Sequence, residues 1–393
     1  MIRIHLYILI ILIFNSNILQ AQEPVFSQYY LNPVYMNPAL AGIDNQYKFC
    51  FNRRQQWSGI PSQFNTTSIS YDSWSNYTNS GFSILNTNNI EGEGLLTTNK
   101  FSTGLSYRLW DRNNSPIKFQ IGLHWQRTTK IIDWSKLVFM DDLDPVHGDI
   151  FSSSFVPHPS NRYVDDNFTL GSVFVYRFRK GARIGRNAIG FDLDTELGYA
   201  VSNLMEMPDA FFSPYTQALR KYTLHGSVTK SIIKNGSNKG AVKGSFFYQK
   251  HGFLSTLQFG AKGIAYPLQF GVFYRSQITT IDNKKSESLY FLISYQKVIP
   301  KANMVMLFSY SRDLTLSKLN TSTNGTDEIA IIIQSRAGGL LTGKFQKRRN
   351  KKFKNRTMPC YDKFTNSSFI STRMGPLNPN PTMKHNNHPD NRR

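Results

Sequence analysis

The fold of this chain is best read from the stretch Ile117-Lys118-Phe119-Gln120-Ile121-Gly122-Leu123-His124-Trp125-Gln126, in which apolar and polar residues alternate. Successive side chains of a β-strand point to opposite faces, so this strand would have one apolar and one polar face. Residues 268–275 and 288–296 repeat the pattern. Such runs last roughly nine to fifteen residues, which is longer than most soluble strands and close to the length that crosses a bilayer. We therefore predict an all-β, transmembrane antiparallel β-barrel.

The alternation divides the region between residues 45 and 336 into about fourteen strands. Long and short connections alternate between them, as in outer-membrane barrels, and the long ones are expected to face outward. An even strand number would place both chain ends in the periplasm. The expected strands are residues 45–56, 63–74, 79–86, 100–110, 116–128, 166–180, 187–201, 220–234, 240–250, 254–264, 267–277, 286–298, 302–312 and 326–336. Trp74, Trp110 and Trp125 lie near the ends of expected strands, where an amphipathic ring can sit at headgroup depth, with ordinary packing as a compatible alternative.

The first residues predict export. Residues 1–21 contain Arg3, an apolar run at 6–14 and Ala21, which is the pattern of a secretory signal peptide with cleavage after Ala21. No later stretch offers about eighteen unbroken apolar residues, so a membrane location would require a barrel. The mean hydropathy of −0.37 fits a barrel with a polar lumen.

Charge is concentrated at the C-terminal end. The chain carries a net charge of +21, and residues 343–393 hold thirteen Lys and Arg against Asp362 and Asp390. We expect residues 337–393 to form a basic, disordered periplasmic tail. An exported chain meets no nucleic acid routinely, so lipid headgroups, cell-wall polymer or an acidic partner face are the expected anionic neighbours. Two cysteines, Cys50 and Cys360, exclude a disulfide framework but leave a single bridge possible.

A segment rich in Asn-Pro follows the expected cleavage site. Residues 22–44 contain Asn32-Pro33 and Asn37-Pro38 with aromatic residues around them. Proline removes a backbone donor and restricts the residue before it, so neither a regular strand nor a regular helix is expected here. The aromatic side chains need a place to be buried. We predict that the segment forms a plug, either in the periplasm or in the barrel lumen.

This segment and Arg54-Gln55-Gln56-Trp57-Ser58-Gly59-Ile60-Pro61 closely resemble the start of the PorP/SprF family of the type IX secretion system of Bacteroidetes. The resemblance continues, in order, through residues 132–139 with 143–145, 199–204 with 207–208, 309–319 and 327–329. The chain departs from the family at Asp327, where histidine is expected, and in the length of its tail. The motif residues are Phe26, Ser27, Gln28, Tyr29, Asn32, Pro33, Asn37, Pro38, Gly42, Arg54, Gln56, Trp57 and Pro61.

The resemblance implies a non-enzymatic outer-membrane component without cofactors. Its implied partners are the type IX secretion machinery, the lipid bilayer and secreted surface cargo, notably large adhesins with a C-terminal sorting domain. Exposed apolar residues in two long loops are candidate partner contacts, with folding onto the barrel as the alternative. These candidates are Trp134, Leu137, Val138, Phe139, Met205, Met207, Phe211 and Phe212.

Other functions have weaker support in the sequence. A passive diffusion channel is the main alternative, because a barrel of fourteen strands can enclose a polar lumen. An outer-membrane hydrolase comes third. Ser227-x-x-Lys230 matches an acyl-transfer motif, but a spacing of three on a strand places the two side chains on opposite faces. An acidic cluster with a nearby histidine matches no calcium-loop signature, so no metal site is predicted. It comprises Asp141, Asp142, Asp144, His147 and Asp149.

Overall fold

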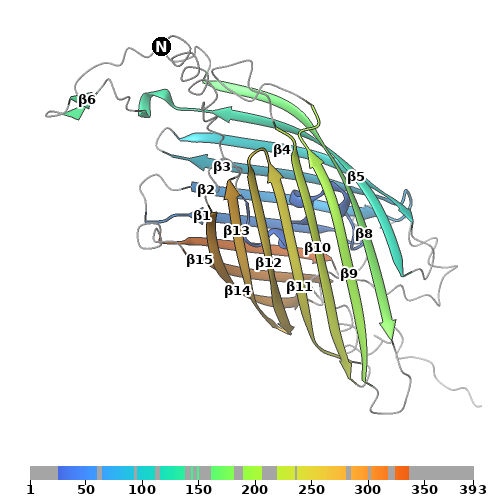
Figure 1. The fold of residues 1–393 in the computed structure, drawn as a ribbon. Helices are drawn as coiled ribbons and strands as arrows, with labels where there is room; N and C mark the ends of the chain where they lie inside the picture. Colours follow the sequence, from blue (N-terminus) through green and yellow to red (C-terminus); the bar gives the residue numbers. More distant parts are fainter. Residues whose placement is uncertain are drawn as a thin grey trace, which may run out of the picture.

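Fourteen antiparallel strands close into a barrel around an N-terminal segment. Figure 1 shows the ribbon of this barrel. The structure is a computed structural model. It describes residues 25–335 except 60–63, 93–94, 111–115, 138–142, 145–147, 150–160, 181–188, 206–218, 235–236, 280–284, 300–301 and 317–323. The expected signal peptide, the tail, Cys360 and Pro61 therefore lie outside the described residues.

Each strand pairs with its neighbour in sequence, and β1 pairs with β16 to close the sheet. A separate two-stranded sheet of β6 (Leu143–Asp144) and β7 (Gly148–Asp149) lies in the β5–β8 connection. The barrel strands are β1 (Lys48–Gln56), β2 (Phe64–Ser75), β3 (Ser80–Glu91), β4 (Leu96–Trp110), β5 (Ile117–Ile131), β8 (Arg162–Lys180), β9 (Ile189–Ser202), β10 (Lys221–Lys234), β11 (Ser237–His251), β12 (Leu254–Ala265), β13 (Leu268–Thr279), β14 (Lys285–Ile299), β15 (Met304–Thr315) and β16 (Thr326–Ser335).

The predicted barrel and its fourteen strands are confirmed, with boundaries that shift by a few residues. The largest shifts are the extension of β3 to Glu91 and the earlier starts of β4 at Leu96 and of β8 at Arg162. We call the end of the barrel where β1 begins the turn rim and the opposite end the loop rim. The two longest connections, 132–161 and 203–220, lie at the loop rim.

The outer surface carries the apolar face that the alternation predicts. Exposed residues such as Leu123, Phe291 and Ile293 face outward, while Gln120, His124 and Ser294 face inward and are buried. None of the helices among the described residues has the length and apolar character needed to cross a membrane. Continuous outward apolar residues on adjacent strands form the belt that a bilayer requires.

The three tryptophans near strand ends divide between the two faces of the barrel. Trp110 is exposed at the turn-rim end of β4, and Trp125 faces outward within β5. Trp74, in contrast, is 2 % exposed and points into the lumen, where the Arg108 guanidinium lies 3.9 Å from its ring centroid. Proximity to a strand end does not determine the face on which a side chain lies, whereas the phase of the alternation does.

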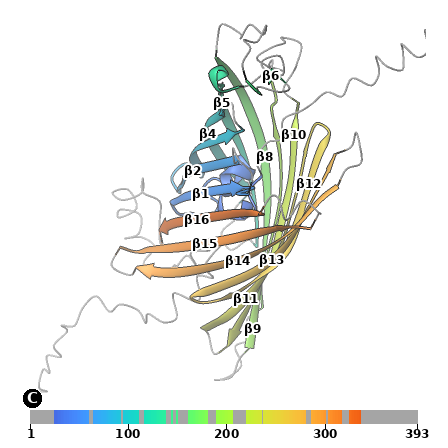
Figure 2. The same cartoon turned by 90° about the vertical axis from the view of Figure 1, so that its left-hand side faces the viewer.

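Residues 25–46, which we call the lumenal segment, lie inside the barrel. The segment contains η1 (Tyr29–Leu31), α2 (Pro33–Met36) and η2 (Pro38–Leu40), and all of its residues except Tyr35 and Asn45 are buried. Figure 2 shows its short blue helices enclosed between β1 and β16 on one side and β8 on the other. Proline at the first position of α2 and of η2 explains why these helices begin there.

Inward-facing glycines allow η2 to approach the wall. A Cβ atom at Gly122 of β5 would lie 2.5 Å from the Ala39 nitrogen, and one at Gly171 of β8 would overlap Asn37 Oδ1. A Cβ atom at Gly81 of β3 would likewise overlap the Ala41 carbonyl oxygen. Side chains at these positions would push the segment away from the sheet.

This close packing gives a first prediction. Gly122→Ala is expected to lower the temperature at which the barrel unfolds, because the new methyl group meets backbone atoms and overpacking typically costs about 1–3 kcal/mol. The measurement is the heating temperature at which the protein loses its fast-migrating folded form on a gel. Gly244→Ala is the matched control, since nothing lies within 4 Å of a Cβ there. Equal transitions for the two variants would contradict the close contact.

Candidate functional site

The lumenal segment is held near the loop rim by a buried ionic cluster. We call Ser27, Gln28, Arg54, Arg275, Asp313 and Glu328 the Ser27 cluster. Its four charged side chains come from β1, β13, β15 and β16, and each is at most 6 % exposed. Two cations face two anions, so the charges balance within the cluster. Balance matters because an unpaired charge in a buried site is very costly.

Ser27 and Gln28 connect these charges. The backbone N–H groups of Ser27 and Gln28 donate to the Glu328 carboxylate at 2.7 and 3.0 Å. The Ser27 hydroxyl lies 2.8 Å from both Asp313 oxygens and accepts a hydrogen bond from Arg275 Nη2 at 2.7 Å and another from Arg54 Nη1.

The wall strands also pair with one another around this serine. Arg275 Nη1 lies 2.9 Å from Asp313 Oδ2. Arg54 Nη1 lies 3.3 Å from Asp313 Oδ2 and 3.5 Å from Glu328 Oε2. Hydrogen bonds to charged groups are the stronger kind, so this cluster fixes the start of the described segment against the wall.

An aromatic stack continues from the cluster. The Tyr29 ring stacks on Phe247 at 4.9 Å, and the Tyr30 ring stacks on Phe273 at 5.6 Å. Phe273 in turn stacks on Tyr290 at 5.1 Å. These wall aromatics face inward, where a water-filled barrel would carry polar residues. They belong to a hydrophobic core that the segment and the wall share.

The two asparagines that precede proline hold the middle of the segment. Asn37 Nδ2 donates to the Ser172 carbonyl at 2.9 Å, and Asn37 Oδ1 accepts from the Ala39 backbone N–H at 2.9 Å. Asn32 bonds with Ser68 and Ser70 of β2, both at 2.9 Å. A segment without regular structure leaves backbone groups unpaired, and these amides supply partners or fix the turns that bury them.

Near the turn rim the wall binds the backbone of the segment directly. Asp72 accepts from the Gly42 N–H at 2.9 Å, while Ser106 and Gln120 both donate to the Ala41 carbonyl at 2.8 Å. Lys48 of β1 pairs with Asp44 at 2.8 Å. Because Ser27 lies near the loop rim and Asp44 near the turn rim, the segment runs down the lumen antiparallel to β1.

The structure brings several motif residues together. Ser27, Gln28 and Arg54 meet in the Ser27 cluster, and Arg54 also donates to Gln56 at 3.4 Å. Phe26 packs edge-on against Tyr35, and Trp57 packs edge-on against Phe64 beyond the end of β1. Gly42 has a φ of +65°, a left-handed conformation that favours glycine. Tyr29, Asn32, Pro33, Asn37 and Pro38 belong to the contacts described above.

Sequence reasoning missed the wall partners of these motif residues. Asp313 and Glu328 stand in stretches that carry the family resemblance, yet they received no role. The signal was available in the phase of β16, because Ile329, Ile331 and Ile333 take the outward positions and leave Glu328 pointing inward. An acidic residue at an inward position of a spanning strand needs a partner, and Arg54 lies opposite it in the β1–β16 register.

The partner-contact candidates are described in part. Trp134 begins η3 (Trp134–Lys136) and is half-buried, as is Leu137, whereas Met205 is 40 % exposed. Asn167 of β8 bonds with both the N–H and the carbonyl of Met205, at 3.1 and 3.0 Å. This backbone is therefore fixed while its side chain is exposed. Val138, Phe139, Met207, Phe211 and Phe212 lie outside the described residues.

The short helix η3 is fixed locally as well. The Asp133 carboxylate accepts hydrogen bonds from the backbone N–H and the hydroxyl of Ser135, at 3.2 and 2.6 Å. These bonds favour the charged form and hold the pKa of Asp133 below its ordinary value. Asp133 thus caps η3 and presents Trp134 at the loop rim.

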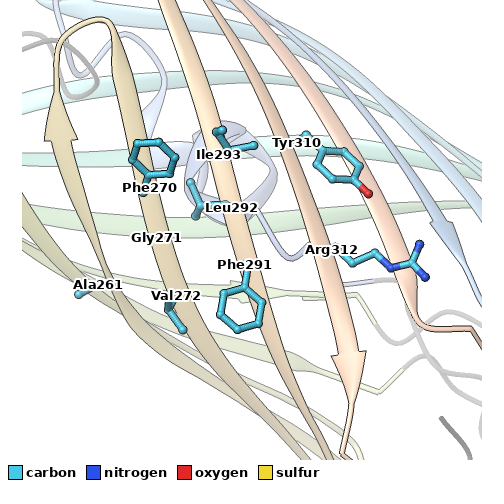
Figure 3. Close-up of a pocket in the computed structure, with 9 residues that line it drawn as sticks. All are labelled: Ala261, Phe270, Gly271, Val272, Phe291, Leu292, Ile293, Tyr310 and Arg312. Carbon is cyan, nitrogen blue, oxygen red and sulfur yellow. The ribbon is translucent and has the colours of Figure 1, made fainter.

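The outer face carries a shallow apolar groove of about 450 Å³ over β12–β15. Figure 3 shows the side chains that line it, with Gly271 between Phe270 and Val272. Arg312 lies at one end and pairs with Asp327 at 2.6 Å, and Asp327 also accepts from Tyr310 at 2.6 Å. Asp327, at the position where the chain departs from the family, thus holds this outward-facing pair together.

The described residues contain no group of three or more His, Cys, Asp or Glu placed to hold a metal. The side chains of the acidic loop cluster lie outside the described part. Ser83 and His124 are within 2.8 Å of each other, but both are buried in the wall of the lumen. Ser227 and Lys230 face opposite sides of β10, so they cannot act as a nucleophile and its base.

The ionic cluster gives a second prediction. Arg275→Met is expected to lower the free energy of unfolding by about 3–5 kcal/mol, because it leaves two buried carboxylates with one arginine. Urea unfolding in detergent micelles measures the change. Arg127→Met is the matched control, since it breaks an ion pair with Asp166 that is exposed on both sides, and it should leave the transition unchanged. Similar transitions for both variants would argue against a buried, paired cluster.

Comparison with solved structures finds other outer-membrane barrels. The Pseudomonas putida toluene transporter TodX is 9 % identical with a TM-score of 0.36, covering 77 % of this chain and 93 % of that one. Acinetobacter baumannii Omp33 is 7 % identical with a TM-score of 0.34, covering 75 % and 100 %. A Pseudomonas aeruginosa FadL homologue is 10 % identical with a TM-score of 0.33, covering 76 % and 91 %. These likenesses concern architecture alone. Comparison with curated proteins finds no significant match.

A family model gives the identity that the sequence motifs point to. The model described as "Type IX secretion system membrane protein PorP/SprF" matches residues 18–333, which is most of the chain. It spans the lumenal segment, all of the barrel strands up to β16 and the Ser27 cluster. This chain belongs to the PorP/SprF family of type IX secretion system membrane proteins and is an integral β-barrel of the bacterial outer membrane.

Proposed function

We propose that this barrel is a non-enzymatic component of the type IX secretion system that helps to secrete or anchor particular surface cargo. The cargo class is that of large adhesins with a C-terminal sorting domain. Loop-rim residues would contact the cargo outside the cell, and the turn rim with the basic tail would meet periplasmic machinery. Family membership supports the association with the secretion system, and the occupied lumen supports a role as a binding scaffold.

The occupied lumen is the observation that carries this proposal. The wall presents inward-facing apolar side chains, including Val173, Phe247, Leu292 and Ile332, and they are buried against Tyr29, Leu31 and Leu40 of the lumenal segment. If the segment left, these side chains would face water at a cost of about 1.5–3 kcal/mol for each large residue. The segment therefore behaves as part of the core.

A passive diffusion channel would need a different interior. Its lumen must stay filled with water and lined by polar residues. Here the segment contacts the wall at the Ser27 cluster, at Asn37 and at Ala41, which are three depths along the lumen. The described contacts thus favour surface binding over solute passage.

A flux assay tests this part of the proposal. Vesicles that contain the purified full-length barrel should take up small neutral sugars no faster than empty vesicles, while vesicles with a general porin serve as the positive control. A variant without residues 22–42 should yield less folded barrel, because its inward apolar residues lose their partners. Sugar uptake at the porin rate by the full-length protein would favour the channel instead.

Cargo capture tests the proposed binding surface. We expect the tagged barrel, purified in mild detergent from its native host, to carry a large secreted protein and components of the secretion machinery that mass spectrometry identifies. Met205→Glu should reduce the recovered cargo several-fold, because it places a charge on an exposed apolar contact whose backbone is fixed. The matched control is Tyr77→Glu, at a residue 84 % exposed in the β2–β3 turn.

The outcomes test separately whether Met205 contacts the cargo and whether the barrel anchors cargo at all. Cargo recovery that is equal for wild type and both variants would remove Met205 from the contact surface. Recovery of the barrel alone, under conditions where other outer-membrane complexes survive, would contradict the anchoring role.

A further inference from the structure

The seam between β1 and β16 closes the barrel, and the lumenal segment lies directly across it. Nine residue pairs form the seam, from Lys48 opposite Gln334 to Gln56 opposite Thr326. On the lumenal side, Gln28 donates to the Glu328 carbonyl of β16 at 3.1 Å, and Cys50 of β1 donates to the Leu31 carbonyl at 3.2 Å. One short stretch of the segment therefore contacts both strands of the seam.

The charges of the Ser27 cluster are divided between the two sides of this seam. Asp313 and Glu328 lie on β15 and β16, and among the described residues Arg275 of β13 and Arg54 of β1 are the cations paired with them. Arg275 pairs with Asp313, whereas Glu328 pairs with Arg54, which lies on the other side of the seam. When β1 joins together with the segment that precedes it, Arg54 and the two backbone N–H groups of Ser27 and Gln28 arrive as one unit.

This arrangement distinguishes the native register from its neighbours. A slip of one residue would turn Arg54 to the lipid-facing side, and a slip of two would move it by roughly 6.6 Å along the strand. In either case Glu328 would lose its arginine. The apolar outer face cannot distinguish the native register from a slip of two residues, because such a slip keeps every apolar side chain on the same face.

We propose that the lumenal segment is an internal template for closure of the β1–β16 seam. The backbone N–H groups of Ser27 and Gln28 bind the Glu328 carboxylate and so set the register in which β1 joins β16. The segment is then an assembly element as well as a core. This role does not depend on which cargo the barrel serves.

Disulfide cross-linking of the full-length protein tests the proposal. Phe49→Cys with Ile333→Cys joins opposite residues of the seam, and Phe270→Cys with Ile293→Cys joins opposite residues of β13 and β14 as the matched control. Both pairs are made with Cys50→Ala and Cys360→Ala. We then add Ser27→Pro, which removes the Ser27 N–H and hydroxyl together, and expect the seam cross-link to fall several-fold while the control cross-link is retained.

A charge exchange separates the template from a simple ion pair. Arg54→Glu with Glu328→Arg restores an opposite pair across the seam but presents an arginine to the N–H groups of Ser27 and Gln28. The template predicts that this exchange does not recover the seam cross-link. Full recovery by the exchange, wild-type seam cross-linking with Ser27→Pro, or equal loss of both cross-links would each overturn the proposal.

Discussion

The rest of this structure depends on apolar side chains that point into the barrel. A strand that crosses a membrane presents one face to lipid, and the other face is normally polar because it meets water. Here Val175, Phe273 and Leu307 face inward and are at most 3 % exposed. They are stable there because the lumenal segment supplies Tyr30, Leu31 and Ile43 as apolar partners. The barrel therefore has two apolar surfaces, an outer one for lipid and an inner one for its own chain.

The polar contacts of the segment follow from its lack of regular structure. Short helices interrupted by Asn-Pro leave backbone groups that neither helix nor sheet can satisfy, and burial makes each unpaired group costly. The wall supplies these hydrogen-bond partners from side chains rather than from strand backbone. Gln120 and Ser106 donate to the Ala41 carbonyl, and Asp72 accepts from the Gly42 N–H. Glycines where the segment lies closest provide the necessary space. The wall sequence is thus fitted to this occupant.

The sequence was informative about the outer face and less so about the inner one. Contact with lipid requires an apolar side chain at every outward position. The alternation of Leu289, Phe291 and Ile293 therefore predicts a strand from one sequence alone. The residue type that suits an inward position depends on what fills the lumen. Tyr290 and Leu292 of that strand are therefore apolar, where a water-filled lumen would require polar residues. Glu328 needed the β1–β16 register before its partner Arg54 could be found, and a register joins residues far apart in the chain.

Among the residues that the structure describes, the same reasoning separates the apolar side chains into those that lipid or the lumenal segment covers and those that neither covers. The outward residues of the strands meet lipid, and the inward residues meet the lumenal segment. Leu204 and Met205 follow the end of β9 and belong to neither group, although they are 37 and 40 % exposed. Loops in water usually place such side chains inward, yet the bonds from Asn167 to the Met205 backbone hold this turn in place. A fixed backbone loses little conformational entropy on binding, which makes such a site suited to a protein contact.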